Sequence, residues 1–321
     1  MSCQSNKRKI EDNGFLKEAV YGLEADEKAD FLTDRLVLLT KHHYDSCDHY
    51  RKILDASYID IHDLKDFRDV PFLPVGLFKE HELNSISNKD IIKTMTSSGT
   101  TGQKVSKIFL NKNTAALQTK VLSKILESFI GKARLPMIIL DSSSVIKDPS
   151  MFSARGAGIL GFSIFGRDKI YALNDKMELD IEGLERFIDK HKNKPILLFG
   201  FTYMIWQYFY RLLKNRKHTL DIEKGIMIHG GGWKKIQDQA VSKSDFKQKI
   251  RSVTGIEMIH DYYGMVEQTG SIFMECSYGH LHSSVFGDVI IRRPHDFSIA
   301  DIGEEGIVQV LSLIPESYPG H

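Results

Sequence analysis

Residues Met95–Ser106, Met-Thr-Ser-Ser-Gly-Thr-Thr-Gly-Gln-Lys-Val-Ser, join two strand-like runs, Asp90–Met95 and Val105–Leu110. Hydroxyl side chains, two glycines and one lysine dominate this loop. The glycines let the backbone approach an anion, the hydroxyl and amide groups donate hydrogen bonds, and the lysine adds a positive charge. The loop therefore predicts a phosphate-binding site. Its candidate residues are Ser97, Ser98, Gly99, Thr100, Thr101, Gly102 and Lys104.

This loop has two alternative interpretations. It is not a Walker A loop, because Gly102 is followed by Gln103 and a β-rich run rather than by Lys-Ser/Thr and a helix. A phosphotransferase that used the same loop would lack both that helix and a plausible general base. An ordinary polar hairpin turn remains the alternative for the loop taken alone.

Two later segments favour a nucleotide. Asp261-Tyr-Tyr-Gly-Met-Val-Glu267 follows the strand-like run Ile256–His260, and His229-Gly-Gly-Gly-Trp233 follows the strand-like run Gly225–Ile228. A tyrosine ring can stack on a purine, three successive glycines leave room for a flat ligand, and the glutamate can hold Mg²⁺ together with a phosphate. For each segment a simple turn at a strand end is the alternative. The candidate residues are His229, Gly230, Gly231, Gly232, Trp233, Asp261, Tyr262, Tyr263, Gly264 and Glu267.

In this order and spacing the three segments resemble the adenylate-forming superfamily. The chain is most similar to the bacterial acyl-protein synthetases, which are long-chain fatty acid ligases of the luminescence fatty-acid reductase complex. The similarity extends from about Phe31 to His321. The motifs that carry it are Phe72-Leu-Pro-Val-Gly-Leu-Phe-Lys79, Ser97-Ser-Gly-Thr-Thr-Gly102, Ser153-Ala-Arg-Gly-Ala-Gly-Ile-Leu-Gly161, Leu198-Phe-Gly-Phe-Thr202, His229-Gly-Gly-Gly-Trp-Lys234 and Ser317-Tyr-Pro-Gly-His321.

This resemblance implies a ligase that uses ATP and Mg²⁺ to activate a carboxylic acid, a fatty acid above all, as acyl-AMP. Lys104 and Glu267 are the implied catalytic residues, with Glu267 on the magnesium and adenine near Tyr262 or Tyr263. The acyl group would then pass to a thiol on the protein, on an acyl-carrier or reductase protein, or on coenzyme A. The competing hypothesis is a non-catalytic or degenerate module that binds an acyl group or a nucleotide.

The sequence departs from the superfamily pattern in two places. Val266 replaces the threonine whose hydroxyl is expected near the AMP phosphate, so phosphate contacts must come from the loop at Ser97–Gly102. The aspartate that holds the ribose hydroxyls, and the small C-terminal portion with further catalytic residues, would follow His321. The chain therefore resembles a family member cut short.

Composition and charge exclude several classes of protein. The 321 residues contain 43 basic and 42 acidic side chains, so no strong field attracts nucleic acid or an anionic membrane. Three scattered cysteines, Cys3, Cys47 and Cys276, suit a reducing compartment better than a disulfide scaffold. The N-terminus lacks the apolar stretch of a signal peptide, so we expect a cytoplasmic protein.

The longest charge-free run, Pro195–Tyr210, is shorter than the roughly 20 residues that span a bilayer. Gly200 divides it into a strand and an amphipathic helix that continues to Lys214. Its aromatic residues, Phe201, Tyr203, Trp206 and Phe209, have the spacing of a buried core, although they could also line an apolar acyl pocket.

Helical and strand-like segments alternate, which predicts layered α/β architecture with mixed sheets flanked by helices and a β-rich C-terminal part. We expect a polar segment over residues 1–24 and one adenylate-forming domain over 25–321. The expected helices are Ala25–Leu54, broken near Lys41, Thr114–Ile130, Leu179–His191 and the segment up to Lys214. The expected strands, besides those above, are Leu135–Leu140, Ile196–Phe199, Ser271–Glu275, Val285–Arg292 and Gly306–Leu313.

Three further motifs resemble known binding-site patterns. Gly156-Ala-Gly-Ile-Leu-Gly161 matches the dinucleotide fingerprint, but no buried strand precedes it and a β-like run, Phe162–Phe165, follows, so we discount it. The segment with His42, His43, Cys47 and His49 is interpreted as a solvated helix face. Cys276, His280 and His282 could supply three zinc ligands at a strand turn, with Cys276 as a buried apolar residue as the simpler alternative.

Overall fold

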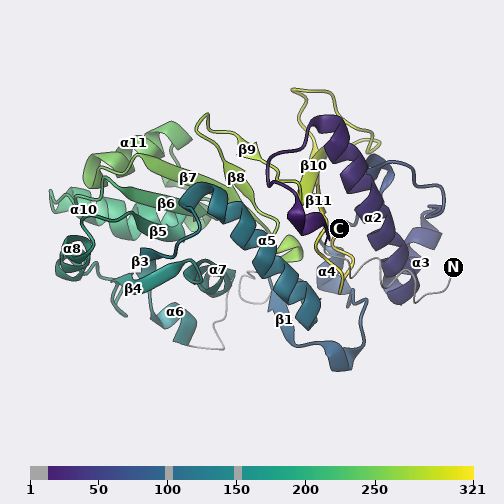
Figure 1. Ribbon diagram of the computed structural model, residues 1–321, viewed down its shortest axis with the longest axis horizontal. Helices are drawn as coiled ribbons and strands as arrows, with labels where there is room; N and C mark the ends of the chain where they lie inside the picture. Colours follow the sequence, from purple (N-terminus) through teal and green to yellow (C-terminus); the bar gives the residue numbers. More distant parts are fainter. Residues whose placement is uncertain (1–13, 98–103, 148–153) are drawn as a thin grey trace. The chain divides into compact units, whose positions relative to one another are not determined.

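The computed structural model describes residues 14–97, 104–147 and 154–321, which form two compact units (Figure 1). Unit 1 contains the described residues up to Ile125 together with Gly264–Ile272 and Ser283–His321. Unit 2 contains Leu126–Tyr263 and Phe273–His282. The chain thus returns to unit 1 twice, and each unit is described by itself.

Unit 2 is built on a seven-stranded sheet with the order β4-β3-β5-β6-β7-β8-β9. The neighbours from β4 to β7 are parallel, whereas β8 and β9 pair in antiparallel fashion. This mixed sheet confirms the predicted α/β fold class. The strands are β3 (Leu135–Ser142), β4 (Gly166–Leu173), β5 (Ile196–Phe201), β6 (Gly225–Gly230), β7 (Met258–Tyr263), β8 (Phe273–Glu275) and β9 (Leu281–His282).

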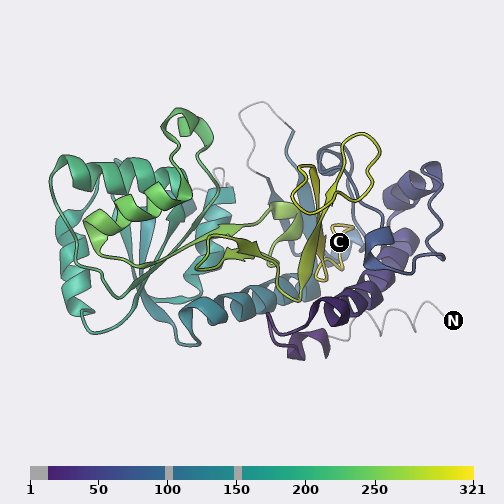
Figure 2. The same cartoon turned by 90° about the horizontal axis from the view of Figure 1, so that it is seen from above.

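Helices cover both faces of this sheet. Gly200 of β5 pairs in register with His229 of β6, so both face the same way, and His229 contacts Phe246 of α11 at 4.6 Å between ring centres. Phe199 faces the opposite side and stacks on Phe162 of α7 at 4.1 Å. Figure 2 shows α11 beside the helical stretch that follows β5. The helices are α6 (Ser144–Lys147), α7 (Ala154–Ser163), α8 (Ile181–Lys190), α9 (Thr202–Met204), the π-helical η5 (Ile205–Tyr210), α10 (Arg211–Asn215) and α11 (Lys243–Thr254).

Unit 1 combines helices with two antiparallel hairpins, one formed by β1 and β2 and the other by β10 and β11. The strands are β1 (Lys93–Thr96), β2 (Lys107–Leu110), β10 (Gly287–Arg292) and β11 (Ile307–Ser312). The helices are α2 (Ala25–Ser46), α3 (Asp48–Ala56), α4 (Leu77–Glu80) and the first part of α5 (Lys112–Ile130), with 3₁₀ turns at η1 (Gly14–Lys17), η2 (Phe67–Asp69), η3 (Asn88–Asp90) and η7 (Val266–Gln268).

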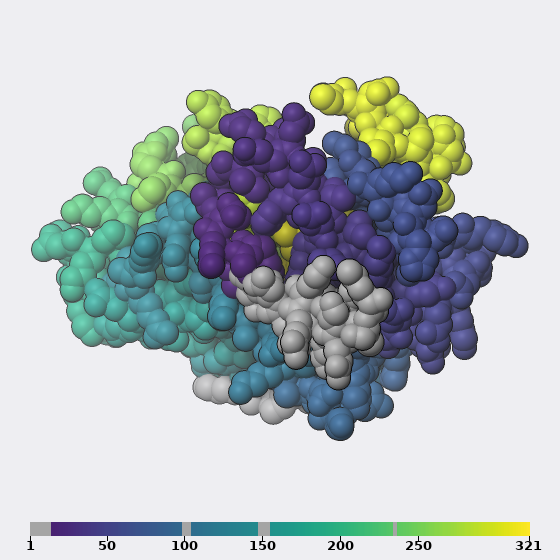
Figure 3. All heavy atoms as spheres, turned by 45° about the vertical axis from the view of Figure 1, so that its right-hand side comes forward, coloured from purple at the N-terminus to yellow at the C-terminus, as the bar shows by residue number. Residues whose placement is uncertain are grey.

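The β10–β11 hairpin packs against the segment after α3. Arg292 donates a hydrogen bond to the carbonyl of Arg68 at 2.9 Å and lies over the ring of Phe72. Phe72 in turn contacts Phe297 in the hairpin loop, at 5.6 Å between ring centres. The space-filling view of Figure 3 shows the yellow atoms of this hairpin beside blue atoms of that segment. Two stretches far apart in the sequence therefore share one surface of unit 1.

The predicted helix break near Lys41 is wrong, because α2 continues to Ser46 and the chain bends at Cys47. Thr40 donates its hydroxyl to Leu36 within the helix, so no polar side chain interrupts the backbone pattern there. Cys47 has extended dihedral angles, φ −122° and ψ 102°, and links α2 to α3. The break therefore occurs at a residue that sequence propensity does not mark.

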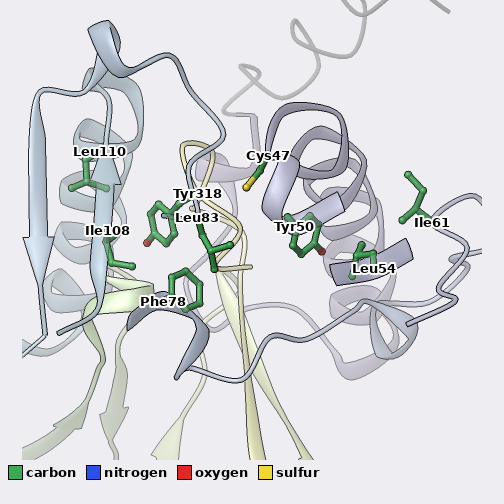
Figure 4. Close-up of a cluster of buried hydrophobic side chains, with 9 residues drawn as sticks. All are labelled: Cys47, Tyr50, Leu54, Ile61, Phe78, Leu83, Ile108, Leu110 and Tyr318. Carbon is green, nitrogen blue, oxygen red and sulfur yellow. The ribbon is translucent and has the colours of Figure 1, made fainter. Parts of the chain in front are cut away.

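The predicted solvated helix face is wrong for His43 and Cys47, although His49 is exposed as expected. His43 is fully buried, and Cys47 is 2% exposed within a hydrophobic cluster of unit 1 (Figure 4). His43 Nδ1 lies 2.7 Å from Ser85 Oγ and Nε2 lies 2.9 Å from the carbonyl of Pro315. These polar partners, remote in the sequence, make the burial of an imidazole possible.

The glycine-rich motif at residues 156–161 lies inside α7. The predicted β-like run after it is wrong, since α7 continues to Ser163 and β4 starts at Gly166. A methyl group at Gly158 would meet the ring of Phe201 at 2.9 Å. Gly158 thus lets α7 pack closely on β5. In the part of the chain that the structure describes, no helix is both long and apolar enough to cross a membrane.

The buried histidines of unit 1 predict a loss of stability in acid. Burial lowers the pKa of His43 well below 6.5, with charge repulsion from His321, His42 and Arg35 acting in the same direction. Burial also lowers the pKa of His321 to about 3. Above pH 6.5 each histidine is neutral in both the folded and the unfolded state, so its titration does not change the free energy of unfolding. As the pH falls below 6.5, only the unfolded state takes up a proton, so each histidine destabilises the fold by about 2 kcal/mol at pH 5.

Urea unfolding at pH 7.5 and pH 5.0 tests this expectation. His43→Gln should reduce the difference between the two free energies of unfolding by about 2 kcal/mol. His62→Gln, at an exposed position, is the control and should leave the difference unchanged. If His43→Gln loses as much stability between pH 7.5 and pH 5.0 as the unmodified protein does, then His43 does not destabilise the fold in acid in this way.

Candidate functional site

The predicted phosphate loop lies at the tip of the β1–β2 hairpin in unit 1. Thr96 of β1 pairs with Lys107 of β2. Beyond this pair, the backbone N–H of Ser97 donates a hydrogen bond to the carbonyl of Ser106. The backbone N–H of Ser106 donates a hydrogen bond to Ser97 Oγ at 3.0 Å. The hairpin thus fixes both ends of the loop, at Ser97 and Lys104. The candidate residues Ser98, Gly99, Thr100, Thr101 and Gly102 lie outside the described residues.

Lys104 follows the loop with its side chain 69% exposed. Its ammonium group lies 2.6 Å from the Glu80 carboxylate at the end of α4, and this hydrogen bond lowers the pKa of Glu80. Exposed pairs of this kind are weak, so a phosphate can replace the carboxylate. Lys107 forms a similar exposed pair with Glu82, at 3.6 Å.

Glu267 occupies the middle of the 3₁₀ turn η7 and is only 6% exposed. Among the described residues, no basic side chain forms an ion pair with it. A buried carboxylate without a partner is unfavourable unless a cation is bound to it. The neighbouring Val266 packs against the hydrophobic cluster of unit 1, so an apolar contact replaces the hydroxyl expected at this position.

His229 and Thr202 lie at the carboxyl ends of β6 and β5 in unit 2. The Thr202 hydroxyl donates to the carbonyl of Gly230 at 3.1 Å and lies 3.0 Å from His229 Nδ1. Because the hydroxyl has one proton, it must accept from His229, which places the imidazole proton on Nδ1. Burial lowers the pKa of His229 to about 3, so the ring is neutral near pH 7. This pair anchors the start of the glycine turn.

The glycine turn after β6 requires its glycines. A methyl group at Gly230 would meet the backbone oxygen of Tyr262 at 2.6 Å. Gly231 and Gly232 have positive φ angles of 79° and 65°, a conformation that other residues rarely adopt. Trp233 follows, with its ring centre 5.1 Å from that of Trp206. The turn therefore lacks side chains at three successive positions, and the last two of them, Gly231 and Gly232, are exposed.

Asp261, Tyr262 and Tyr263 belong to β7 itself rather than to a loop after it. The predicted end at His260 is wrong because β7 pairs with β6 through His229↔Asp261 and with β8 through Tyr263↔Phe273. Tyr262 packs against Phe162 and Phe199, whereas Tyr263 is 45% exposed. Of the two predicted stacking residues, Tyr263 has the accessible ring. Gly264, also exposed, follows it as the first residue of the next stretch of unit 1.

Burial raises the pKa of Asp261 to about 6, and the nearby Glu275 carboxylate adds to the rise. Glu275 is 1% exposed, accepts the backbone N–H of Asp261 at 3.0 Å and pairs with Lys247 of α11 at 2.8 Å. Ser242 caps the start of α11 and Gly255 ends it, which places Lys247 at this position. Sequence reasoning missed this support for β7, because a single Glu in a strand carries no local signal.

A second polar group in unit 2 was also missed. Asp141, near the end of β3, is 1% exposed and lies 3.1 Å from the Nε atom of Arg155 at the start of α7. Arg155 also donates to the Tyr203 hydroxyl at 3.0 Å. Burial raises the pKa of Asp141, and Arg155 opposes the rise. The sequence signal for this group was Asp141 itself, an aspartate that directly follows the apolar run Leu135–Leu140.

Cys276, His280 and His282 lie in the β8–β9 hairpin. The backbone N–H of Cys276 donates to the carbonyl of His280 at 2.9 Å, and Cys276 is half-buried. Over the residues whose positions the structure describes, no three His, Cys, Asp or Glu side chains gather in a way that could hold a metal ion. We therefore do not propose zinc here.

The aromatic residues after β5 are largely buried. Phe201 is 6% exposed, Trp206 7% and Phe209 1%, and Tyr203 is half-buried. Trp206 contacts Trp233, Tyr210 and Phe246, which joins the π-helical η5 to α11 and to the glycine turn. This packing favours the core interpretation over an open acyl pocket.

Comparison with solved structures supports this fold. A crystal structure of 2-hydroxyisobutyryl-CoA ligase in complex with 2-HIB-AMP and CoA aligns with 92% of this chain, with a TM-score of 0.69 and 14% sequence identity. The alignment covers 62% of the ligase chain, so this chain spans less than two thirds of that protein. At this identity the similarity establishes the fold alone.

Sequence comparison identifies closer relatives. A long-chain-fatty-acid–luciferin-component ligase of Aliivibrio fischeri is 22% identical over 297 residues, which are 86% of this chain and 73% of the relative. The ligase of the same name from Vibrio harveyi is 23% identical over 307 residues, which are 90% of this chain and 76% of the relative. A model of the family described as acyl-protein synthetase, LuxE, matches residues 6–321, and the chain therefore belongs to this family.

Proposed function

We propose that this protein activates a long-chain fatty acid with ATP to form acyl-AMP and then transfers the acyl group to a thiol. Family membership supports this proposal, as do the two bacterial relatives, which are named as long-chain-fatty-acid–luciferin-component ligases. The 2-hydroxyisobutyryl-CoA ligase structure, which holds an acyl-AMP and CoA, supports it at the level of the fold.

The buried carboxylate of Glu267 is the observation that carries the proposal. It is 6% exposed and has no ionic partner within the described part of the chain, so it suits a bound cation. Magnesium fits, since it takes one or two carboxylates together with substrate phosphates. When bound, Mg²⁺ would neutralise charge on the phosphates.

The chain's own residues supply the remaining parts. In unit 1, the backbone and hydroxyl groups at Ser97–Gly102 would hold the phosphates, and Lys104 would exchange Glu80 for the departing pyrophosphate. In unit 2, the Gly230–Gly232 turn and the exposed ring of Tyr263 would hold the adenine base. Positioning and charge stabilisation account for catalysis of this kind, with little covalent work by the protein.

In the first half-reaction, a carboxylate oxygen of the fatty acid attacks the α-phosphorus of ATP. A bond forms between that oxygen and the α-phosphorus. The bond between the α-phosphorus and the oxygen that bridges to the β-phosphate breaks, and pyrophosphate leaves. In the second half-reaction, a thiol attacks the acyl carbonyl and AMP leaves. The thiol belongs to the protein itself, to an acyl-carrier or reductase protein, or to coenzyme A.

The alternative, a binding module without catalysis, is favoured by one observation, the apolar packing of Val266 in place of a phosphate-contacting hydroxyl. Nucleotide binding alone fits both hypotheses, but only the enzyme exchanges labelled pyrophosphate into ATP when a fatty acid is present. That exchange assay distinguishes the two.

Ligand preference gives a direct test. Trp206 and Trp233 are the two tryptophans of the sequence and contact each other beside the glycine turn, so intrinsic fluorescence reports on this region. We expect a response to ATP with Mg²⁺ and none to NADPH. Saturated fatty acids of increasing length should raise the melting temperature progressively, since each buried methylene contributes about 0.8 kcal/mol. A response to NADPH alone, or no trend with chain length, would contradict the proposal.

A further inference from the structure

The strand order of unit 2 marks a second ligand-binding position beside the glycine turn. In the order β4-β3-β5-β6-β7, β4 lies on one side of β3 and β5 lies on the other, so the direction in which strands are added reverses at β3. The helix α7, which follows β3, packs on one face of the sheet, whereas η5, which follows β5, packs with α11 on the other. Open α/β sheets bind ligands at such a switch point, beyond the carboxyl ends of the strands. A ligand is therefore expected beyond β3 and β5.

Residues from both strand ends converge on one guanidinium group at this point. Asp141, the second-last residue of β3, is 1% exposed, and its Oδ2 atom lies 3.1 Å from Nε of Arg155 near the start of α7. Tyr203, the second residue after β5, accepts a hydrogen bond from Arg155 Nη1 at 3.0 Å. The Arg155 side chain is 27% exposed, so it extends from the buried aspartate towards solvent.

The guanidinium group of Arg155 is held at two of its three nitrogen atoms. Nε faces Asp141, and Nη1 donates to the Tyr203 hydroxyl and lies 3.7 Å from Met204 Sδ. The third nitrogen, Nη2, donates no hydrogen bond to any described residue. A guanidinium group fixed in this way presents its remaining N–H donors in a rigid geometry that suits a carboxylate. Asp141 balances its charge while no ligand is bound, which limits the cost of a half-buried cation.

The ring of Phe201 connects this position to the glycine turn. A methyl group at Gly158 of α7 would meet this ring at 2.9 Å, and a methyl group at Gly231 of the turn would meet it at 2.6 Å. Arg155 lies three residues before Gly158, which is about one turn along the same side of α7. The segment that carries Arg155 and the proposed adenine-binding turn thus contact the same aromatic ring at one end of the sheet.

We propose that Arg155 binds the carboxylate of the acid substrate, and that Asp141 and Tyr203 position the guanidinium group for this role. The carboxylate and the phosphates of ATP repel each other, and a guanidinium group beside the carboxylate offsets this repulsion while it fixes the direction of attack. The inference rests on the proposed function and deepens it, because it names the residue that receives the acid in the first half-reaction.

Decanoic acid and 1-decanol test the proposal, since the two ligands share an alkyl chain and differ in the carboxylate. Calorimetry with Mg²⁺ and α,β-methylene-ATP, whose carbon bridge prevents the release of pyrophosphate, measures both dissociation constants without turnover. We expect the unmodified protein to bind the acid more tightly than the alcohol. Arg155→Gln should weaken binding of the acid about 10- to 100-fold, as for the loss of hydrogen bonds to a charged group, and leave binding of the alcohol unchanged.

Two further variants control for charge and for folding. Arg186 of α8 is exposed in the same unit and pairs with Glu182 at 3.7 Å, so Arg186→Gln should change neither dissociation constant. Arg155→Gln leaves the buried Asp141 without its counter-ion, which can prevent folding. The double variant Arg155→Gln with Asp141→Asn removes both charges together and should show the same loss of acid binding.

The outcomes separate the carboxylate site from the proposed activity. A preference for the acid that persists in Arg155→Gln or in the double variant would overturn the role of Arg155 and leave the proposed activity in place. Equal binding of acid and alcohol by the unmodified protein would also overturn the carboxylate site. If Arg155→Gln loses the preference but the unmodified protein exchanges no pyrophosphate into ATP, the carboxylate site stands and the proposed activity fails.

Discussion

Replacing Lys104 by alanine should slow fatty-acid-dependent exchange of pyrophosphate into ATP by about 10²- to 10³-fold. The ammonium group is expected to face the leaving pyrophosphate, so it stabilises charge that is largest in the transition state. The structure shows this side chain exposed, and among the described residues it pairs with Glu80, 2.6 Å away. ATP binding should weaken far less than the rate, because most of the interaction develops during the reaction.

Lys107→Ala is the matched control for this variant. Lys107 is three residues away, is also exposed and also pairs with a glutamate, Glu82. We expect its exchange rate to stay within about twofold of the unmodified protein, because a surface pair contributes little. Equal rates for Lys104→Ala and Lys107→Ala would refute the role of Lys104, and an unmodified chain without exchange would favour the binding module.

Much of the fold is predictable because its signals are local. Leu135–Leu140, Ile196–Phe199 and Gly225–Ile228 are uninterrupted apolar runs, as expected for parallel strands with both faces covered, and the structure places each in the central sheet. The errors occur where distant residues decide the outcome. His43 is buried because its partners Ser85 and Pro315 lie 42 and 272 positions away, which no helical pattern reveals.

The same distinction applies to the candidate site. The glycines at 230–232 were recognisable because glycine itself marks a turn, and their positive φ angles give the physical reason. The role of Thr202 was not recognisable, because its contact with His229 spans 27 residues and depends on the alignment of β5 with β6. Lys104 and Glu267 could be proposed from composition and spacing, but the absence of an ionic partner for Glu267 among the described residues required coordinates.

Replacing Phe209 by alanine should destabilise unit 2 by about 3–5 kcal/mol, measured as the free energy of unfolding in urea. Phe209 is 1% exposed in the π-helical η5, between the buried side chains of Ile205 and Leu213 in the sequence. Truncation of such a ring removes apolar burial and leaves a cavity that the surrounding residues fill only in part. Tyr278→Ala is the control within the same unit, since Tyr278 is 88% exposed and should change stability by no more than about 0.5 kcal/mol.

This variant also decides between a core and an acyl pocket after β5. If Phe209 is core, its loss lowers stability and leaves the preferred fatty acid length unchanged. If the ring lines an acyl pocket, space already exists beside it, so the stability cost falls below about 1 kcal/mol and longer fatty acids bind better by about 0.8 kcal/mol for each added methylene. The two results exclude each other, because a cavity that accepts a longer chain is not filled by protein.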